Sequence, residues 1–287
     1  MNIPPFWARA RHDGVDARGR PLTFLASGWS FSSLQEAKEE AAARARRVFE
    51  IFLEGREPRR YEYGDRPIRE EIVQEIAEGE ERIAVVTRNR YGALVLNCSN
   101  ALFADVDFPK TGSGGLIAAL LCLISPKRAK AAERARVDET VAKVREWAHS
   151  NPGRSFRLYR TKEGLRLLFT DKAYDPASEE AAGILSGLGA DPMYIKLTRN
   201  QRCFRARLTA KPWRCGFRRP PAPFPWADQA AEAAFREWEE AYTKRDAGFK
   251  VCEFLAEFGK PGGVAALRTI VDLHDRGTRV GADAALA

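Results

Sequence analysis

The sequence predicts an α+β protein built around a mixed or antiparallel sheet. Three short apolar runs follow one another between residues 82 and 108, separated by Asn, Arg, Gly and Ser, a pattern typical of strands and turns. A hairpin-like pair follows at residues 154–170. With 287 residues, 45% of them apolar, the chain is long enough to bury such a core. We expect an N-terminal α/β unit (1–80), a central core (81–219) and a proline linker with a helical tail (220–287).

The N-terminal unit is predicted to combine two strands with two helices. Residues 6–13 and 21–29 alternate between apolar and polar side chains around a turn-rich segment. A long helix follows, because Ser33 and Glu36 have the spacing of a capping box, in which both side chains satisfy amides at the helix start. Isoleucines spaced by four residues predict a second, shorter helix over residues 67–78.

The central core is predicted to hold most of the strands. Expected strands cover residues 82–87, 92–97, 101–108, 154–160 and 164–170, with two further strands within 193–208. Expected helices cover residues 127–149 and 177–188. Four prolines between Pro220 and Pro225 force an extended connector, and the spacing of apolar residues beyond it predicts a helical tail.

Charge and composition restrict the classes of function. Lys and Arg number 47 against 39 Asp and Glu, a net charge of +8, which favours a polyanionic partner although a basic surface also aids solubility. The longest apolar stretch, 115–124, is about half the roughly 20 residues that a membrane span needs, so we expect no membrane partner. The N-terminus lacks the apolar run of a secretory signal, and five cysteines without a C-x-x-C pair indicate reduced thiols in the cytoplasm.

Two aspartates on the expected strand 101–108 are the sharpest local feature. Asp105 and Asp107 are two positions apart, so their side chains project from the same face of the strand. Carboxylates this close repel each other unless a cation or a proton lies between them. Paired oxygen ligands suit Mg²⁺ or Mn²⁺, which stabilise phosphoryl displacement. The alternative is that one or both aspartates cap a turn at the strand end.

A run of cations on the expected strands is the second feature. Nine cations occur with no acidic residue among them: Lys196, Arg199, Arg202, Arg205, Arg207, Lys211, Arg214, Arg218 and Arg219. Aromatic residues interleave with them. Guanidinium groups bind phosphates through paired hydrogen bonds and aromatic rings stack on bases, so the run suits a nucleotide or a single-stranded nucleic acid, with nucleic-acid contacts expected from Arg205, Arg207, Lys211 and Trp213. The alternative is an edge strand that positive charge protects from aggregation.

The expected hairpin is also rich in cations. Arg160, Lys162 and Arg166 crowd it, and Gly164 in the turn lets backbone amides approach an anion. Arg166 alternates with leucines, so it leaves the strand on the opposite face from them. Two interpretations remain open. Arg166 either reaches a phosphate in the same cleft as the aspartates or neutralises them in a structural ion pair.

A third acidic residue is less sharply defined. Asp191 follows the expected helix 177–188, where a chain commonly re-enters a sheet, but it also fits an ordinary turn before proline. Asp171 and Asp175 compete for the same role. A Ser-His-Asp or Cys-His nucleophile arrangement has no support in the sequence.

Taken in order, these segments resemble the archaeo-eukaryotic primase superfamily, in particular its primase-polymerases. That family places Asp-x-Asp or Asp-x-Glu on one strand, a small-x-His motif on a second, and a further Asp preceded by an apolar residue. Asp105 and Asp107 match the first motif. Residues 161–169 resemble the second, with Arg166 where the family has its histidine, and Asp191 matches the third.

The resemblance extends over roughly residues 94–211. Residues similar to the cluster that follows the third motif in eukaryotic primase-polymerases are Tyr194, Lys196, Arg199, Asn200, Phe204 and Arg205, with extra residues interposed. Each motif alone is short, and their order is the stronger argument.

The resemblance implies a palm domain with an RNA-recognition-like sheet and a metal-dependent nucleotidyltransferase activity. Asp105, Asp107 and Asp191 would hold two Mg²⁺ or Mn²⁺ ions. The incoming nucleoside triphosphate would contact Arg166, Lys196 and Arg199, together with Arg160 and Lys162 of the hairpin, and the second substrate would be a DNA or RNA strand. Two alternatives stay open: a non-catalytic nucleic-acid-binding protein with the same fold, and a two-metal nuclease.

Overall fold

The computed structural model describes residues 1–56, 66–109 and 126–287. Its strands are β1 (Phe6–Val15), β2 (Pro21–Ser30), β3 (Glu71–Glu78), β4 (Glu81–Arg88), β5 (Leu94–Cys98), β6 (Phe103–Asp107), β7 (Phe156–Arg160), β8 (Gly164–Phe169), β9 (Phe204–Arg207), β10 (Phe249–Lys250), β11 (Glu253–Phe258) and β12 (Ala285–Leu286). Its helices are α1 (Leu34–Leu53), α3 (Pro126–Ser150), α4 (Glu179–Gly187), α5 (Pro192–Gln201), α6 (Gln229–Asp246) and α7 (Arg268–Thr278), with short 3-10 turns η1 (Pro212–Cys215) and η2 (Ala265–Leu267). The expected α+β class is confirmed.

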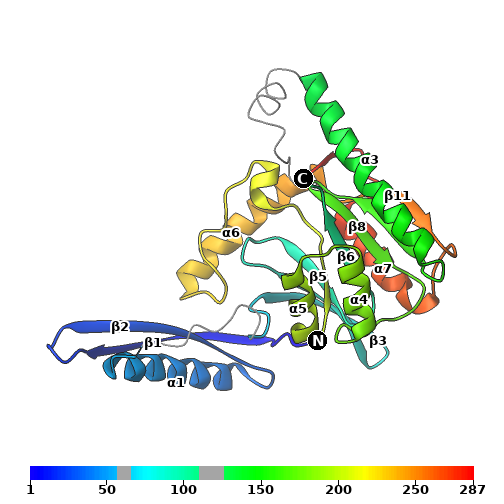
Figure 1. The fold of residues 1–287 in the computed structure, drawn as a ribbon. Helices are drawn as coiled ribbons and strands as arrows, with labels where there is room; N and C mark the ends of the chain where they lie inside the picture. The colour runs from blue at the N-terminus through cyan, green and yellow to red at the C-terminus, as the bar shows by residue number, and fades with distance from the viewer. Residues whose placement is uncertain (57–65, 110–125) are drawn as a thin grey trace.

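The N-terminal ribbon of β1 and β2 with the helix α1, which we call the wing, projects from the rest of the molecule (Figure 1). Ser33 caps α1 as expected, since its hydroxyl accepts a hydrogen bond from the Glu36 amide. The helix packs on the ribbon through small residues. A Cβ atom at Gly28 would lie 2.3 Å from the backbone nitrogen of Ala41, so the close approach of helix and strand depends on a residue without a side chain.

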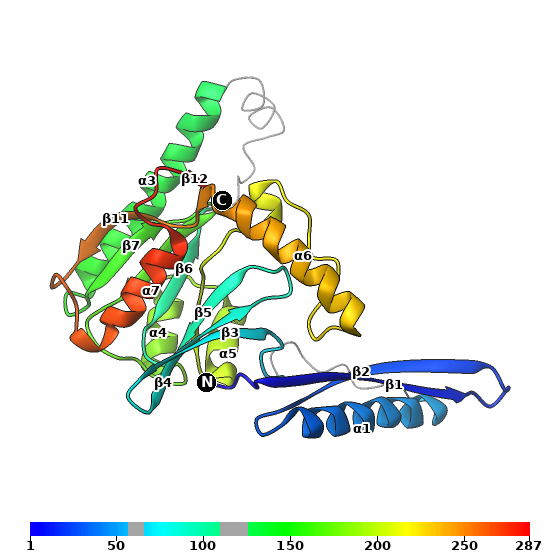
Figure 2. The same ribbon diagram turned by 180° about the vertical axis from the view of Figure 1, so that it is seen from behind.

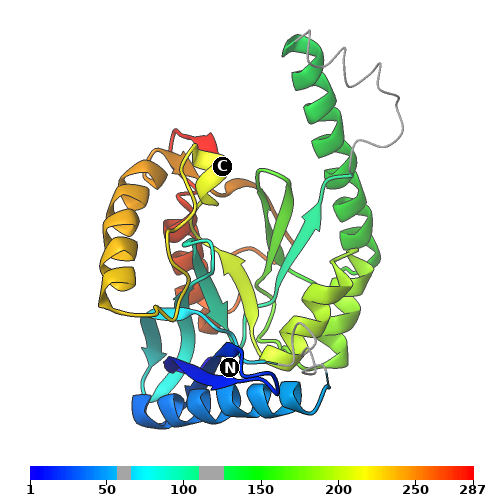
Figure 3. The same cartoon turned by 90° about the vertical axis from the view of Figure 1, so that its left-hand side faces the viewer.

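Two four-stranded antiparallel sheets form the centre of the molecule, in the strand orders β3-β4-β5-β9 and β11-β7-β8-β6. Figure 3 shows these strands between α6 on one side and α3 on the other. β3 comes from the expected N-terminal unit and β11 from the expected tail, so strand pairing crosses both boundaries that the sequence suggested. The expectation of a single central sheet was wrong, because the strands are divided between two sheets.

The two sheets meet at a seam between β6 and β9, the end strands of their respective sheets. Two side chains bridge this seam. Arg166 on β8 donates from Nη1 to the backbone carbonyl of Arg207 at 2.9 Å. Tyr194 on α5 donates to the carbonyl of Phe103 at 3.0 Å and accepts from the amide of Arg205 at 3.4 Å. Side chains thus satisfy backbone groups at this junction.

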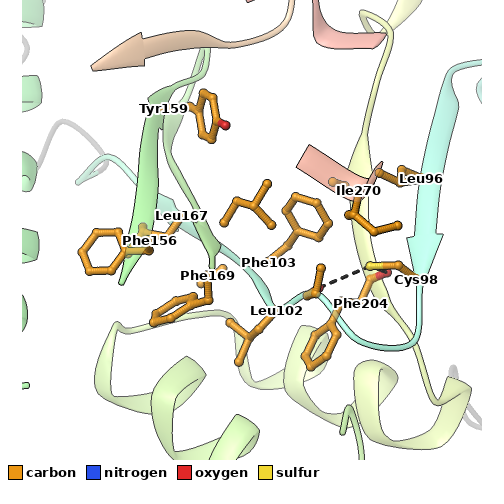
Figure 4. Close-up of a cluster of buried hydrophobic side chains, with 14 of the residues drawn as sticks. Leu96, Cys98, Leu102, Phe103, Phe156, Tyr159, Leu167, Phe169, Phe204 and Ile270 are labelled. Carbon is orange, nitrogen blue, oxygen red and sulfur yellow. Dashed lines mark hydrogen bonds between the residues drawn. The ribbon is translucent and has the colours of Figure 1, made fainter. Parts of the chain in front are cut away.

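The largest apolar cluster among the described residues lies between the two sheets and the helices α3, α4 and α7, and a separate cluster packs α6 against η1. Figure 4 shows part of the largest cluster, with Phe103, Phe204 and Ile270 drawn from β6, β9 and α7. Phe156 stacks on Phe258 of β11 with ring centroids 4.8 Å apart. Burial of these rings, each worth a few kcal/mol by transfer, holds the two sheets and α7 together.

Residues 67–78 do not form the helix that the isoleucine spacing predicted; residues Glu71–Glu78 form β3, which pairs with β4. A spacing of four fits the two-residue period of a strand as well as a helical turn, so the pattern did not separate them. The β-branched content of this segment and the free edge of β4 favour the strand.

Two other segments also differ from expectation. Within 193–208, only Phe204–Arg207 is a strand, and the first part is helix α5. Asp191 caps this helix and Pro192 occupies its first turn, a start signal that the alternation of apolar residues obscured. The tail contains β11 at the open edge of β7 as well as α6 and α7 (Figure 2), so an entirely helical tail was wrong.

The apolar stretch 115–124 lies outside the described residues. Among the residues that are described, no helix is both long and apolar enough to cross a membrane. Four cysteines are described, and all four are free thiols buried in the interior.

Candidate functional site

The two aspartates of β6 project from the same face at the end of that strand. Asp105 pairs in register with Arg166 and Asp107 with Gly164, on β8. A Cβ atom at Gly164 would lie 2.3 Å from the carbonyl oxygen of Val106, so glycine allows β8 to begin directly against the end of β6. The carboxylates remain accessible: the side chain of Asp105 is 51% exposed, and Asp107 is also exposed.

Asp105 and Arg166 form a two-point ion pair. Arg166 donates from Nε to Oδ1 at 2.7 Å and from Nη2 to Oδ2 at 2.9 Å, while its own side chain is only 2% exposed. Its Nη1 is bonded to the Arg207 carbonyl, so this guanidinium is committed within the protein. Of the two interpretations of Arg166, the structure has the ion pair.

The ion pair keeps Asp105 charged. Burial by itself would raise the pKa of Asp105, but the positive charge and the hydrogen bonds of Arg166 outweigh it and lower that pKa below its ordinary value. The same attraction raises the pKa of Arg166 although burial opposes it. A carboxylate has about four lone-pair directions, so a paired Asp105 retains acceptor capacity on its exposed side.

Asp107 is in the opposite electrostatic situation. Its pKa is raised, first by desolvation and then by repulsion from the carboxylates of Asp105 and Asp191, with partial compensation from Lys211. The three predicted acids therefore act on one another. The charge of Lys211 only partly offsets the negative charge around Asp107. A divalent cation bound there would reduce the repulsion among the carboxylates.

Asp191 has a structural role as well. It is the N-cap of α5, and its Oδ1 accepts a hydrogen bond from the amide of Met193 at 2.7 Å. Within residues 1–56, 66–109 and 126–287, no three His, Cys, Asp or Glu side chains form a group that could hold a metal ion. Asp105, Asp107 and Asp191 are thus electrostatic neighbours and do not form a closed ligand set.

Partly buried cations lie next to these acids. Arg207 is the last residue of β9. Lys211 directly precedes the turn η1, and Arg214 lies within it. Burial, followed by repulsion from Arg166 and Arg214, lowers the pKa of Arg207 to about 10. The pKa of Lys211 is lowered by burial and by the charges of Arg207 and Arg214.

Neighbouring cations repel Arg207 and Lys211, whereas Arg214 has an acidic partner. Nε of Arg207 is buried and has no hydrogen-bond partner among the described residues. Arg214 lies 3.6 Å from Glu163, an exposed residue of the β7–β8 turn. We call Arg207, Lys211 and Arg214 the cation trio. A phosphate group bound here would accept a hydrogen bond from the unused Arg207 donor and reduce the repulsion among the three cations.

An aromatic surface adjoins the cation trio. Trp213 is 43% exposed and meets Tyr91 edge to face, with ring centroids 5.0 Å apart. The guanidinium of Arg219 and the ammonium of Lys211 lie 5.2 and 5.6 Å from the Trp213 ring centroid. Exposed rings beside cations are the usual platform for stacking a nucleic-acid base.

Two other residues of the basic run are held in ion pairs. Arg205 donates to both carboxylate oxygens of Glu70 at 2.7 Å, and that carboxylate also accepts from the Thr87 hydroxyl at 2.5 Å. The ion pair between Arg199 and Glu179 joins α5 to α4. Lys196 lies at an exposed position on α5. The structure therefore gives Arg205 and Arg199 structural partners in place of an open anion site.

Two of the three hairpin cations, Arg160 and Lys162, lie apart from the aspartates. Arg160 immediately follows Tyr159, whose register partner is Arg166, so Arg160 points to the other face of the sheet. There it pairs with Glu133 of α3 at 2.6 Å. With Lys162 it lines a separate hollow of about 350 Å³. The expected cluster of Arg160, Lys162 and Arg166 around one anion is thus divided by the sheet.

Arg214 and Tyr91 were not singled out by sequence reasoning. Arg214 was named only as one member of the acid-free run, because its place near Arg207 depends on the turn η1. Tyr91 has no local signal, because only the fold brings it to Trp213. No protein-family model, curated protein or solved structure matches this chain.

A buried histidine gives the fold a pH dependence. His274 on α7 is fully buried, with Nδ1 2.9 Å from Asp275 Oδ1, and burial is the main reason that its pKa is lowered. The unfolded chain therefore binds this proton at a higher pH than the folded chain does, so stability present at pH 7 declines below about pH 6.5. We expect the free energy of unfolding to fall by up to about 1.4 kcal/mol per pH unit in that range.

Urea unfolding between pH 8 and 5 measures this slope. His274→Gln is expected to flatten it, whereas His149→Gln, at an exposed position, keeps the slope of the natural protein. Equal slopes in the natural protein and His274→Gln would contradict the assignment.

Proposed function

We propose that this chain is a metal-dependent nucleotidyltransferase of the primase-polymerase type that acts on DNA or RNA strands. One observation carries the proposal: the acids of β6 lie beside the cation trio, where Asp107 is repelled by two other carboxylates and Arg207 and Lys211 are repelled by neighbouring cations. A nucleoside triphosphate with a divalent cation supplies opposite charge to both groups, because the cation faces the acids and the phosphates face the trio.

The donor set fits Mg²⁺ or Mn²⁺. Mg²⁺ in phosphoryl-transfer sites is commonly bound through one or two carboxylates, with substrate phosphates and water completing its shell. Asp107 and the exposed side of Asp105 would hold it, with Asp191 as the next acid. When bound, the metal would neutralise the triphosphate and lower the pKa of the attacking 3′-hydroxyl.

The protein's own residues have distinct tasks in this proposal. Arg166 is a positioning residue, since its two-point contact fixes the orientation of Asp105 and keeps that carboxylate ionised. The cation trio would grip the triphosphate. Trp213, with Tyr91 and Arg219 around it, would stack on a base of the strand or the nucleotide.

The motif order supports the primase-polymerase assignment, together with an antiparallel four-stranded sheet that carries Asp105 and Asp107 at its edge. This chain would differ from the family at one point. The family's histidine contacts the nucleotide phosphates, whereas Arg166 is turned to Asp105 here. We therefore assign phosphate binding to the cation trio in place of Arg166, Arg160 and Lys162.

A non-catalytic nucleic-acid-binding protein is the second candidate. The Asp105–Arg166 ion pair favours it, because an acid neutralised within the protein has less need of a metal ion. The basic and aromatic surface around Trp213 would serve either function.

Incubation of a labelled primer–template with Mn²⁺ or Mg²⁺, with and without nucleoside triphosphates, tests the proposal. We expect the labelled strand to lengthen only when both metal and nucleotides are present, because the acids and the trio need their counter-ions together. Shortening of the strand would replace the proposal by a two-metal nuclease. An unchanged strand with salt-sensitive binding would select the non-catalytic candidate.

A further inference from the structure

A column of polar side chains lies against Arg166, at the end of its guanidinium that does not contact Asp105. Nη1 of Arg166 lies 3.8 Å from Sγ of Cys252, and Nε2 of His274 lies 3.8 Å from the same sulfur. Nδ1 of His274 lies in turn 2.9 Å from Oδ1 of Asp275. Cys252 directly precedes β11, and the other two residues belong to α7. We call Cys252, His274 and Asp275 the buried column.

The thiol and the imidazole of this column are sealed in the interior. Cys252 and His274 are both 0% exposed, whereas the side chain of Asp275 is 24% exposed. Tyr159 and Phe103, both labelled in Figure 4, contact the His274 ring, with ring centroids 4.7 and 5.4 Å from it. A nucleophile must reach its substrate, so a Cys-His-Asp order at this depth does not make a nucleophilic site. The column can act only on the residues that it touches.

The chemistry of the three groups sets the direction of each contact. The Asp275 carboxylate accepts, so we assign the ring hydrogen of His274 to Nδ1, which leaves Nε2 to accept from the Cys252 thiol. Burial raises the pKa of Cys252 to about 11, so the thiol keeps its hydrogen at neutral pH. The sulfur lone pairs then remain for a hydrogen of Arg166 Nη1.

The sulfur is the last of the acceptors around the Arg166 guanidinium. Nε and Nη2 donate to Asp105, and Nη1 donates to the carbonyl of Arg207. Nη1 carries two hydrogens, so the carbonyl and the Cys252 sulfur can each accept one. An unused donor is costly in a buried position, so these acceptors together restrict the guanidinium to one orientation. That orientation is the one that presents Nε and Nη2 to the carboxylate of Asp105.

We propose that Cys252 and His274 are positioning residues for Asp105 and act on it through Arg166. His274, held by Asp275, orients the thiol, and the thiol holds Nη1 of Arg166. Arg166 in turn fixes the carboxylate that would face the metal ion. The effect of the column on incorporation rests on the proposed function, whereas its effect on the Arg166 side chain needs no reaction.

Cys252→Ala and Cys252→Ser form a matched pair that tests this role. Both substitutions delete the sulfur and give side chains of similar size, but only serine keeps an acceptor on the same carbon. If the thiol merely filled space, serine would harm the protein at least as much as alanine, because serine buries a hydroxyl among apolar side chains. Cys203→Ala is the control for loss of a buried thiol, since Cys203 packs in a separate apolar cluster with Ile3 and Val85. Circular dichroism confirms the folding of each variant.

The kinetics of incorporation give the first comparison. Cys252→Ala is expected to lower kcat at least about fivefold, the effect of one lost hydrogen bond to a charged group, with no change in KM for the nucleoside triphosphate. Cys252→Ser and Cys203→Ala should both stay within about twofold of the natural kcat, because each keeps an acceptor for Arg166. Adding His274→Gln to Cys252→Ala should lower kcat little further, since both residues act through one contact. Equal losses of kcat in Cys252→Ala and Cys252→Ser would overturn the inference.

The ¹⁵N NMR signal of the Arg166 Nε–H group gives a comparison that needs no activity. The Arg166→Met variant identifies this signal by its absence. In Cys252→Ala we expect the signal to shift and its hydrogen exchange with water to accelerate at least about fivefold, whereas Cys252→Ser keeps the natural behaviour. An unchanged signal in Cys252→Ala would overturn the inference. If the natural protein incorporates no nucleotide, the proposed function fails, and the NMR comparison alone decides whether the column holds Arg166.

Discussion

Replacing Asp107 by Asn is expected to reduce nucleotide incorporation at least about 100-fold and to leave the fold intact. The substitution removes a ligand from a two-carboxylate metal site, and a loss of about 2.7 kcal/mol of transition-state stabilisation corresponds to two factors of ten. Folding should not suffer, because Asp107 is exposed and its carboxylate is repelled by Asp105 and Asp191. Incorporation rates on a primer–template, together with thermal unfolding, measure both effects.

Glu163→Gln is the matched control for this variant. Glu163 also contributes negative charge near Asp107 and is exposed, but it lies in the hairpin turn beside Arg214. We expect the incorporation rate of Glu163→Gln to stay within about threefold of that of the natural protein, because solvent screens the charge of an exposed residue. Asp191→Asn adds a second comparison, because asparagine preserves the N-cap of α5 while removing the charge. Wild-type incorporation by Asp107→Asn would contradict the proposed function.

Breaking the Asp105–Arg166 ion pair is expected to have unequal effects on stability that depend on which partner is removed. Asp105→Ala leaves the Arg166 charge in a 2% exposed position with the Arg207 carbonyl and the Cys252 sulfur as neutral acceptors, so we expect a loss of about 3 kcal/mol or more. Arg166→Met frees a carboxylate that is 51% exposed and that water can solvate, so the loss should be clearly smaller. Urea unfolding of the two variants measures the difference.

The double variant Asp105→Ala, Arg166→Met completes the comparison. It should recover most of the stability that Asp105→Ala loses, because it no longer buries an uncompensated charge. The geometry indicates that the two residues stabilise each other. Strictly additive losses of stability in the double variant, or equal losses in the two single variants, would contradict this coupling. Inactivity of an Asp105 variant is therefore ambiguous between catalysis and folding, which is why Asp107 is the better probe of the reaction.

Local patterns predicted the elements whose signals are local. The capping box at Ser33 located the start of α1, and the alternation around Asp105 correctly placed both aspartates on one face of a strand. The segment 67–78 was misassigned because spacing by four residues is shared by helices and strands. The start signal at Asp191 and Pro192 was present in the sequence but was overridden by an apparent alternation downstream.

The candidate site was only partly predictable because it depends on register and on long-range packing. Sequence reasoning placed Arg166 opposite the leucines but could not show that Asp105 is its register partner on β6. The acid-free run indicated a basic surface, yet it did not separate Arg205, which pairs with Glu70, from Arg207, whose Nε has no partner among the described residues. That distinction arises from residues more than a hundred positions away in the sequence.

The seam between the sheets has a mechanical consequence for the reaction that we propose. The acids stand on β6, whereas the cation trio begins on β9, and these strands belong to different sheets. Their alignment is maintained by the side chains of Arg166 and Tyr194. A small rotation of one sheet against the other would therefore change the gap between metal and phosphate, so catalytic precision would depend on residues that never touch the substrate.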